Sequence, residues 1–416
     1  MRTLKISVLA ALLAPALASA SGFEVINVNP RDLGICASGV AAQRDAAATY
    51  QNPSALSKLD GLNLSLAGAM LSIHTEWTGD ASRGPGTTDP RGPAPQGSAE
   101  TKFAPTPPVG LFVAYGRQVA GRGLGVGFGV AVPGGGQMKW EEDWQGRGRI
   151  ITVERRMLGF YLNAGYEVLP WLRVGGGVIY YEGIQYLKQG VEPFAGAYGE
   201  LDTSGGGFSF QLATEVRPLE NLTIGVDYKH KATMEMEGDG NFEVPPSIEV
   251  PLTQDQDVSQ DLPFPNTLAV GVAYRVTKPV QLTLQYNYSR FSVYTEDRFV
   301  GDRGLVLVVP RDYRDGNVLR GGVEWDTTPL LTLRAGAMYD WSGLRTSTLS
   351  PTLPDSNTLG FSGGASWKFS PDLAVHGALF YGDRKKQTAT GDAAFPGSYK
   401  TNVWIASLGV TWRTAL

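Results

Sequence analysis

The feature that most constrains the fold is a period-two alternation of polar and apolar residues. Residues 281–289 read Gln-Leu-Thr-Leu-Gln-Tyr-Asn-Tyr-Ser, and similar segments recur along the chain. A β-strand with this pattern has one apolar face and one polar face. Segments of about ten residues are long enough to cross a bilayer as tilted strands. Because no run of eighteen apolar residues follows residue 20, membrane-spanning helices are excluded.

The alternating segments number fourteen, an even number, as in the closed barrels of bacterial outer membranes. We therefore predict an all-β fold, a 14-stranded antiparallel transmembrane β-barrel. The segments begin near Leu62, Val109, Leu124, Leu158, Leu172, Gly207, Leu222, Leu268, Val280, Leu319, Leu331, Leu359, Leu373 and Asn402.

The connections between these segments alternate in length, as expected for short periplasmic turns and long outer loops. The short ones are 120–123, 168–171, 217–221, 276–279, 326–329 and 370–372. The long ones are 77–106, 133–149, 186–205, 232–262, 293–315, 342–357 and 383–398. Aromatic residues that could form membrane-surface girdles are Tyr115, Tyr166, Tyr180, Trp325, Trp341, Trp367 and Trp412.

Three regions follow from this pattern. Residues 1–20 have a basic start, an apolar stretch and an Ala-Ser-Ala cleavage site, which indicates a secretory signal peptide. Residues 21–61 precede the first strand and are expected to fold into the lumen as an N-terminal hatch, or plug. Residues 62–416 are the predicted transmembrane barrel, which localises the protein to the outer membrane of a Gram-negative cell, in contact with its lipids.

Composition argues against several other functions. The formal net charge is −4, whereas nucleic-acid binding needs a basic face. With one cysteine and three histidines in 416 residues, no metal site or cofactor is expected. A single chain that closes its own barrel is expected to be a monomer.

The alternation also assigns faces, and it places apolar residues in the lumen, where a water-filled pore would carry polar ones. These residues could contact a hydrophobic ligand or pack against the hatch. Three arginines, Arg173, Arg320 and Arg334, could hold a carboxylate or could pair with acids such as Glu215, Glu324 and Asp340. The candidate ligand-binding residues are Phe112, Met157, Tyr161, Arg173, Ile179, Tyr181, Arg320, Arg334, Met338 and Phe380.

Several stretches resemble the FadL-type family of outer-membrane transporters. They are Gly22-Phe23, Leu33-Gly34, Ser38-Gly39, Asn52-Pro53-Ser54-Ala55-Leu56, residues 333–340 and Pro351-Thr352-Leu353-Pro354-Asp355. The resemblance covers the mature chain. It implies a barrel with a hatch, containing Leu33, Gly34, Ser38, Gly39, Asn52 and Pro53, that takes up long-chain fatty acids or aromatic hydrocarbons.

The resemblance also implies a kink in the third strand that opens a sideways exit to the membrane. The strand has glycine at its inward positions from Gly125 to Gly129 and then runs into Pro133, Gly134, Gly135 and Gly136. Since proline cannot donate to the ladder, we predict that pairing breaks at Pro133 and the glycines that follow it. The alternative is a flexible start to the next loop.

The chain departs from the family pattern at three places. Ile26-Asn27-Val28 stands where the founding fatty-acid transporter has Asn-Glu-Phe, Asn-Pro-Ser-Ala replaces Asn-Pro-Ala, and the last residue is Leu416 rather than an aromatic. The departures leave the fold prediction intact but leave hatch gating and the ligand open.

We expect passive uptake of hydrophobic molecules and no enzymatic activity. A porin for small polar solutes is the main alternative. An outer-membrane esterase using Ser362 and His376 is a weaker one, because the Gly-Phe-Ser-Gly-Gly sequence lies within a strand rather than a strand-to-helix turn. Apolar residues of the long loops could form an outer collection site: Phe194, Tyr198, Phe242, Val244, Ile248, Val250 and Leu252.

Overall fold

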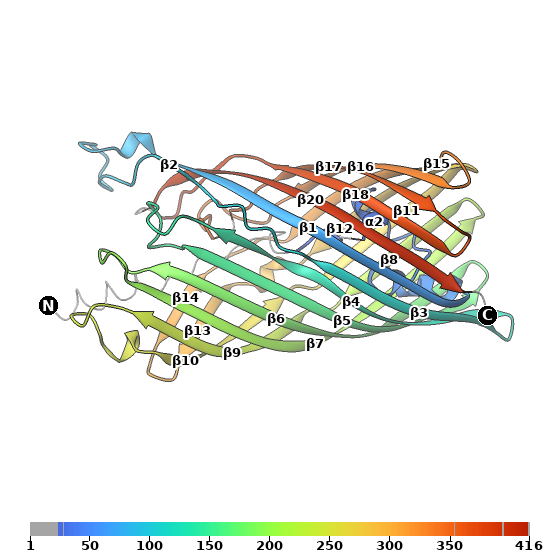
Figure 1. The fold of residues 1–416 in the computed structure, drawn as a ribbon, viewed down its shortest axis with the longest axis horizontal. Coiled ribbons are helices and arrows are strands. Elements are labelled where there is room, and N and C mark those ends of the chain that lie inside the picture. The colour runs from blue at the N-terminus through green and yellow to red at the C-terminus, as the bar shows by residue number, and fades with distance from the viewer. Residues whose placement is uncertain (1–23, 28, 353, 393–394, 415–416) are drawn as a thin grey trace.

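The computed structural model describes residues 24–414 apart from 28, 353, 393 and 394. The predicted signal peptide and Leu416 lie outside these residues. The described chain forms a closed antiparallel β-barrel of fourteen wall strands, as the alternation predicts (Figure 1). Each wall strand pairs with the next, and the first and last strands close the barrel with continuous pairing from Leu62–Thr414 to Gly79–Gly397.

The wall strands agree with the fourteen predicted segments, although many are longer than ten residues. In order around the barrel they are β1 (Gly61–Gly79), β3 (Val109–Val119), β4 (Arg122–Lys139), β5 (Thr152–Leu169), β6 (Leu172–Gly190), β7 (Tyr198–Leu219), β8 (Leu222–Lys229), β11 (Thr267–Thr277), β12 (Val280–Ser289), β15 (Gly316–Asp326), β16 (Leu331–Trp341), β17 (Thr358–Lys368), β18 (Leu373–Arg384) and β20 (Gly397–Thr414).

The long connections contain more regular structure than predicted. Residues 232–262 and 293–315 are not loops, because they hold β9 (Ala232–Glu243), β10 (Gln256–Phe264), β13 (Glu296–Gly301) and β14 (Val306–Pro310). β9 pairs with β7 and β10, and β13 pairs with β10 and β14, so these strands extend one side of the wall beyond the short β8, β11 and β12 (Figure 1). Two short strands, β2 (Ser98–Glu100) and β19 (Gln387–Thr388), pair with β1 and β20.

The described helices are all short. They are α2 (Pro30–Leu33), α3 (Ala48–Gln51) and the 3₁₀ helices η1 (Pro53–Lys58), η2 (Ala81–Arg83), η3 (Pro251–Thr253) and η4 (Phe291–Val293). No described helix has the length and apolar character needed to cross a bilayer.

The outer surface of the barrel is apolar, as a wall in contact with lipid requires. Exposed leucine, valine and phenylalanine side chains alternate with buried residues along the strands, as at Leu162, Leu284 and Leu408. Six of the seven predicted girdle aromatics are exposed, and Tyr180 is half-buried.

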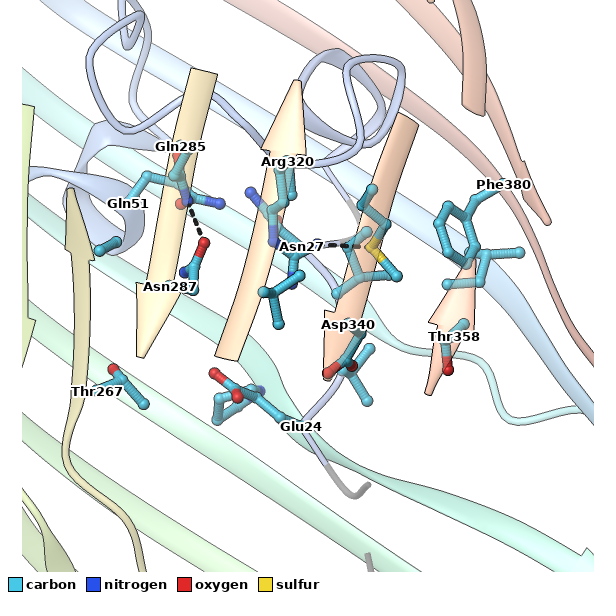
Figure 2. A pocket seen from close by; sticks show the side chains of 18 of the residues that line it. Glu24, Asn27, Gln51, Thr267, Gln285, Asn287, Arg320, Asp340, Thr358 and Phe380 are labelled. Atoms are coloured by element: carbon cyan, nitrogen blue, oxygen red, sulfur yellow. Dashed lines mark hydrogen bonds between the residues drawn. The ribbon is translucent and has the colours of Figure 1, made fainter. Parts of the chain in front are cut away.

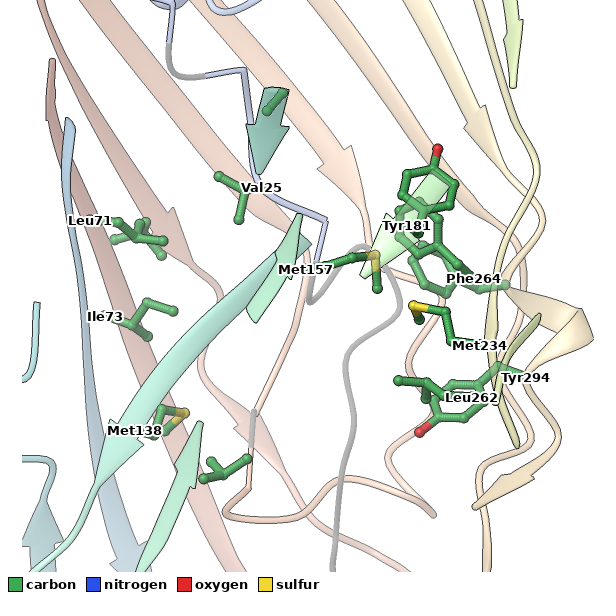
Figure 3. Packing of buried hydrophobic residues seen from close by; sticks show 14 of the residues in the cluster. Val25, Leu71, Ile73, Met138, Met157, Tyr181, Met234, Leu262, Phe264 and Tyr294 are labelled. Carbon is green, nitrogen blue, oxygen red and sulfur yellow. The ribbon is translucent and has the colours of Figure 1, made fainter. Parts of the chain in front are cut away.

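Residues 24–60 without 28, hereafter the N-terminal segment, contact wall strands β4, β5 and β6 through η1 and β17, β18 and β20 through α2, and buried apolar side chains lie on the inner face of the wall. Figure 1 shows α2 within the barrel, and Figure 3 shows Leu71 and Ile73 on one wall and Tyr181 and Phe264 on another. Inward glycines let the segment approach the wall. A Cβ at Gly125, Gly165 or Gly175 would overlap the backbone of η1 or the residue before it.

Candidate functional site

A cavity of about 140 Å³ lies between the N-terminal segment and the inner wall. Residues 24–27 line it, together with side chains from β1, β8, β11, β12, β15, β16, β18 and β20. Figure 2 shows inward side chains of neighbouring strands converging on this space, with Arg320 and Asn27 near its middle and Phe380 at one side. The wall residues that line the cavity lie two positions apart on their strands, as Leu71 and Ile73 do, because inward positions recur at every second residue.

One part of the lining is apolar and continuous across several strands. Leu71 of β1 lies directly opposite Ile405 of β20, and Phe380 of β18 pairs with the same Ile405. Met338 and Phe380 both lie over Gly360 of β17, where a Cβ would come within 2.8 Å of each side chain. The glycine therefore gives these two side chains the room to pack together.

Another part of the lining is polar. Gln285 Nε2 donates a hydrogen bond of 2.9 Å to Asn287 Oδ1 on β12. Lys229 forms an ion pair with Asp227 on β8, and its Nζ lies 4.9 Å from the centre of the Tyr50 ring. The cavity thus offers an apolar surface and a polar surface to the same occupant.

The N-terminal segment contributes two acids with raised pKa values. Burial raises the pKa of Glu24, whose Oε2 accepts a hydrogen bond of 2.9 Å from Ser289 Oγ. Burial also raises the pKa of Asp32 from its ordinary value of 3.8 to about 6. Asp32 accepts hydrogen bonds of 2.9 Å from Asn27 Nδ2 and Gln43 Nε2, so it links the cavity lining to the rest of the segment.

The three predicted arginines have different surroundings. Arg173 pairs with Glu215 at 3.1 Å, and Arg334 pairs with Glu324 at 2.7 Å, so both form ion pairs with acids. Arg320 pairs with no acid in the described part of the chain. Its Nη1 donates to the carbonyl of Cys36 and to Met338 Sδ, each at 3.2 Å, and its buried Nε has no hydrogen-bond partner.

The other candidate ligand-binding residues divide into two groups. Tyr181, Met338 and Phe380 line the cavity with Arg320. Phe112, Met157, Tyr161 and Ile179 are buried outside its lining. Tyr161 and Phe112 lie with ring centres 5.1 Å and 6.4 Å from Tyr50 of the N-terminal segment, so they contact this segment.

The residues assigned to the hatch by resemblance lie in the N-terminal segment against the wall. Ser38 Oγ lies 2.6 Å from Thr283 Oγ1, and a Cβ at Gly34 would come within 3.1 Å of Arg334. Asn52 caps η1, whose first residue is Pro53, and its Nδ2 donates to the carbonyl of Val40 at 2.8 Å. Leu33 is buried, and Gly39 accepts a hydrogen bond from Gln43.

The pairing of β4 with its neighbours is irregular around Pro133, but it does not break at the glycines as predicted, because Gly134, Gly135 and Gly136 stay paired with β5. Pairing with β3 ends at Val130, opposite Leu111. Pairing with β5 shifts by one residue between Ala131 and Gly134, which leaves an extra residue in β4, a β-bulge. The carbonyl of Pro133 accepts a hydrogen bond of 2.9 Å from the Val25 N–H. The N-terminal segment therefore occupies the bulge from the lumen side.

The chain facing the bulge also lacks donors. Residues 105–108 read Pro-Thr-Pro-Pro. Thr106 exchanges hydrogen bonds of 2.9 Å with Leu71 of β1, so the backbone groups of Pro105 and Pro107 point to the β4 side. Proline has no N–H to give, and contact with β4 resumes only where Lys102 N–H donates to Lys139 O. Both edges of the interruption are thus encoded by proline.

The two residues considered for an esterase are not brought together. Ser362 Oγ accepts a hydrogen bond of 2.9 Å from the Cys36 N–H. His376 instead contacts Ser366 Oγ at 2.6 Å and Thr411 Oγ1 at 2.8 Å.

One group of metal-ligating residue types comes together on the outer face, away from the cavity. His74, Glu76 and Glu100 have ligand atoms within 4.8 Å of one another, on β1 and β2. All three side chains are substantially exposed, and we assign them no part in transport.

Sequence reasoning missed the contribution of the N-terminal segment to the cavity. Glu24, Asn27 and Tyr50 line it, although none was a candidate. Asn27 stands in the stretch that replaces the family's Asn-Glu-Phe, which was a usable signal. The predicted collection-site residues Phe242, Val244, Ile248 and Leu252 pack partly buried against the core, as does Phe194.

Comparison with known proteins gives the following matches. The family model described as outer membrane protein transport protein (OMPP1/FadL/TodX) matches residues 11–413. A 47 kDa outer membrane protein of Pasteurella multocida is 27% identical over 154 residues, which are 36% of this chain and 35% of that protein. The structure of a FadL homologue of Pseudomonas aeruginosa has a TM-score of 0.81 at 19% identity, covering 94% of this chain and 99% of that chain. The Pseudomonas putida toluene transporter TodX has a TM-score of 0.74 at 16% identity, covering 95% and 100%.

Proposed function

Because the chain belongs to the outer membrane protein transport protein family (OMPP1/FadL/TodX) and is an outer-membrane β-barrel, we propose that it takes up hydrophobic molecules through its lumen. The observation that carries the proposal is the apolar part of the cavity, where Leu71, Phe380 and Ile405 lie together on the inner face of the wall. Transfer of apolar surface from water is favourable by about 25 cal/mol for each Å², so a hydrophobic molecule can enter such a cavity without an energy source.

We assign the cavity-lining residues Tyr181, Arg320, Met338 and Phe380 to the ligand. Phe112 and Tyr161, by contrast, contact Tyr50 and hold the N-terminal segment, and Met157 and Ile179 are buried outside the lining of the cavity. Arg173 and Arg334 already form ion pairs with Glu215 and Glu324, which argues against either arginine binding the carboxylate of a ligand.

The N-terminal segment acts as the hatch in this proposal. It contacts β4, β5 and β6 through η1, and β17, β18 and β20 through α2, so it crosses the lumen between opposite walls. A molecule in the cavity then finds its passage to the periplasm obstructed. The route that remains is sideways.

The sideways exit is the interruption of β4 at Pro133, Gly134 and Gly135. Pro133 and Gly135 line the cavity, so the ligand lies next to the place where β3 and β4 are unpaired. Val25 covers this place from inside through its hydrogen bond to Pro133. Movement of residues 24–27 would open a path from the cavity to the bilayer, where an apolar molecule partitions passively.

The exit can be tested by removing the extra residue of β4. In cells that lack their own such transporter, the Val132 deletion should restore continuous pairing with β5 and remove the bulge beside the gap between β3 and β4. It should lower uptake of radiolabelled toluene or oleate at least tenfold. Val132→Ala, which keeps the strand length, is the control and should transport normally. Folding of each variant is checked by its heat-dependent mobility in SDS gels.

Two results would contradict the proposal. Full uptake by a folded deletion variant would exclude the sideways route while leaving transport itself intact. Stable ion conductance in planar bilayers, with uptake of neither compound, would favour the porin alternative instead.

A further inference from the structure

The charge in the cavity is unevenly compensated. Lys229 is paired with Asp227, and Arg384 lies 3.4 Å from Asp355. Arg320 donates only to a carbonyl and a thioether, and its buried Nε donates to nothing in the described chain. The Arg320 side chain is only partly buried, but its Nε is inaccessible, and a buried donor without a partner is costly unless a ligand completes its hydrogen bonds.

The acids that line the cavity do not supply that anion. Glu24 forms its side-chain hydrogen bond with Ser289 and no ion pair with Arg320 within the described chain; burial raises its pKa, and the charge of Arg320 lowers it by less. Asp340 lies two residues beyond Met338 on β16, and Met338 is the residue directly opposite Arg320. At the strand rise this is about 7 Å further along the wall. The position next to the Arg320 fork is therefore open to an anion from outside.

The size of the cavity limits the apolar part of the occupant. The cavity measures about 140 Å³, close to the roughly 150 Å³ of an engineered apolar cavity that holds benzene. A single ring fits within this volume, whereas most of a long acyl chain would have to extend out of the cavity. Aromatic side chains border it, since Tyr50, Tyr181, Phe264 and Phe380 all line the cavity.

The charged and apolar parts of the lining adjoin. Arg320 Nη1 lies 3.2 Å from Met338 Sδ, and Met338 packs with Phe380 over Gly360. A guanidinium binds a carboxylate through two parallel hydrogen bonds. Within the uptake function proposed above, on which this inference rests, we propose that the cavity selects a monoaromatic carboxylate. Its carboxylate binds Arg320, and its ring packs against Met338, Phe380 and Ile405.

The test compares three probes on the full mature chain in lipid nanodiscs: 4-methylbenzoate, toluene, which has the same ring without the carboxylate, and oleate. Calorimetry should give 4-methylbenzoate the highest affinity of the three. Arg320→Met replaces the guanidinium with an apolar side chain of similar length. It should weaken 4-methylbenzoate binding at least tenfold, as loss of a charged hydrogen-bond pair implies. Toluene binding should stay within about twofold of the wild type. Arg275→Met, at a periplasmic turn, is the matched control and should change neither.

The outcomes separate this inference from the function on which it rests. Two results would overturn the substrate class while leaving hydrophobic uptake in place. One is a higher wild-type affinity for toluene or oleate than for 4-methylbenzoate. The other is an equal loss of affinity for 4-methylbenzoate and toluene in Arg320→Met. If Arg320→Met does not fold, the wild-type affinity ratio of 4-methylbenzoate to toluene decides alone, and a ratio at or below one overturns the inference. Failure of all three probes to bind or enter cells would instead contradict the proposed function.

Discussion

At the scale of residues, two buried acids tie the N-terminal segment to the wall. Glu324 of β15 pairs with Arg44 of the segment and with Arg334 of β16. Glu215 of β7 pairs in the same way with Lys58 of the segment, at 2.6 Å, and with Arg173 of β6. Each acid thus holds one cation from the segment and one from the wall. Removing Glu215 leaves Lys58 without its acid and leaves Arg173 with Glu167 alone, at 3.8 Å.

We predict that Glu215→Gln loosens the end of the N-terminal segment. Breaking a buried ion pair costs about 3–5 kcal/mol, because an uncompensated charge stays behind. Hydrogen exchange of residues 53–58 should accelerate by at least a hundredfold while β11 and β12 stay protected. Glu235→Gln, an exposed position on β9, is the control and should leave exchange unchanged. Unchanged exchange in Glu215→Gln would show that packing alone holds η1.

A second prediction concerns Asp32 and pH. Its folded pKa of about 6 lies above the ordinary aspartate pKa of 3.8, so the folded segment binds the proton more tightly than the unfolded chain. The stabilisation by protonated Asp32 is therefore complete below about pH 4 and is lost as pH rises to about 6. The change is at most roughly 3 kcal/mol.

The measurement is hydrogen exchange of residues 30–36 at pH 4.5 and pH 7, corrected for the intrinsic rates. Protection should be higher at pH 4.5 in the wild type, and Asp32→Asn should remove the difference. The same pH dependence in the Asn variant would assign it to another group, such as Glu24.

At the scale of elements, inward glycines form the surface on which η1 lies. At Gly165 a Cβ would overlap the carbonyl of Pro53. We predict that Gly165→Ala displaces η1 and destabilises the segment by about 1–3 kcal/mol, the usual cost of overpacking. Gly68→Ala is the matched control, because a Cβ there meets nothing within 4 Å. Protease sensitivity of residues 48–60 checks the prediction, and equal sensitivity in both variants would contradict it.

The wall strands could be predicted from sequence because alternation is a local property. The same reasoning failed at β9, although Met234-Glu235-Met236-Glu237 alternates as clearly as the wall strands do. Sorting connections by length assigned this stretch to an outer loop. The structure shows that the wall continues past the ends of β8, β11 and β12 as β9, β10, β13 and β14. The length of a connection alone does not distinguish such strands from an irregular loop.

At the scale of the whole molecule, the candidate site was predictable only in part. Alternation places Arg173, Arg320 and Arg334 all on the inner face. Which of them lacks an acid depends on contacts between strands and with the N-terminal segment, far apart in sequence. The same holds for Phe112 and Phe380, of which one contacts the segment and the other the cavity. The position of the N-terminal segment therefore decides the role of each inward residue.

A barrel that lacks its N-terminal segment should therefore still fold. It should also conduct ions, which the full mature chain should not do to the same extent. The wall closes through its own strand pairs, and after loss of residues 24–60 the buried Glu215 and Glu324 keep Arg173 and Arg334 as partners. We predict that a chain lacking residues 24–60 still shows heat-dependent mobility in SDS gels. In planar bilayers its conductance should exceed that of the full mature chain at least tenfold, because the lumen loses the backbone that crosses it. A folded deletion variant with the low conductance of the full chain would mean that the strands β9, β10, β13 and β14 close the lumen from outside, and that the N-terminal segment is not the hatch.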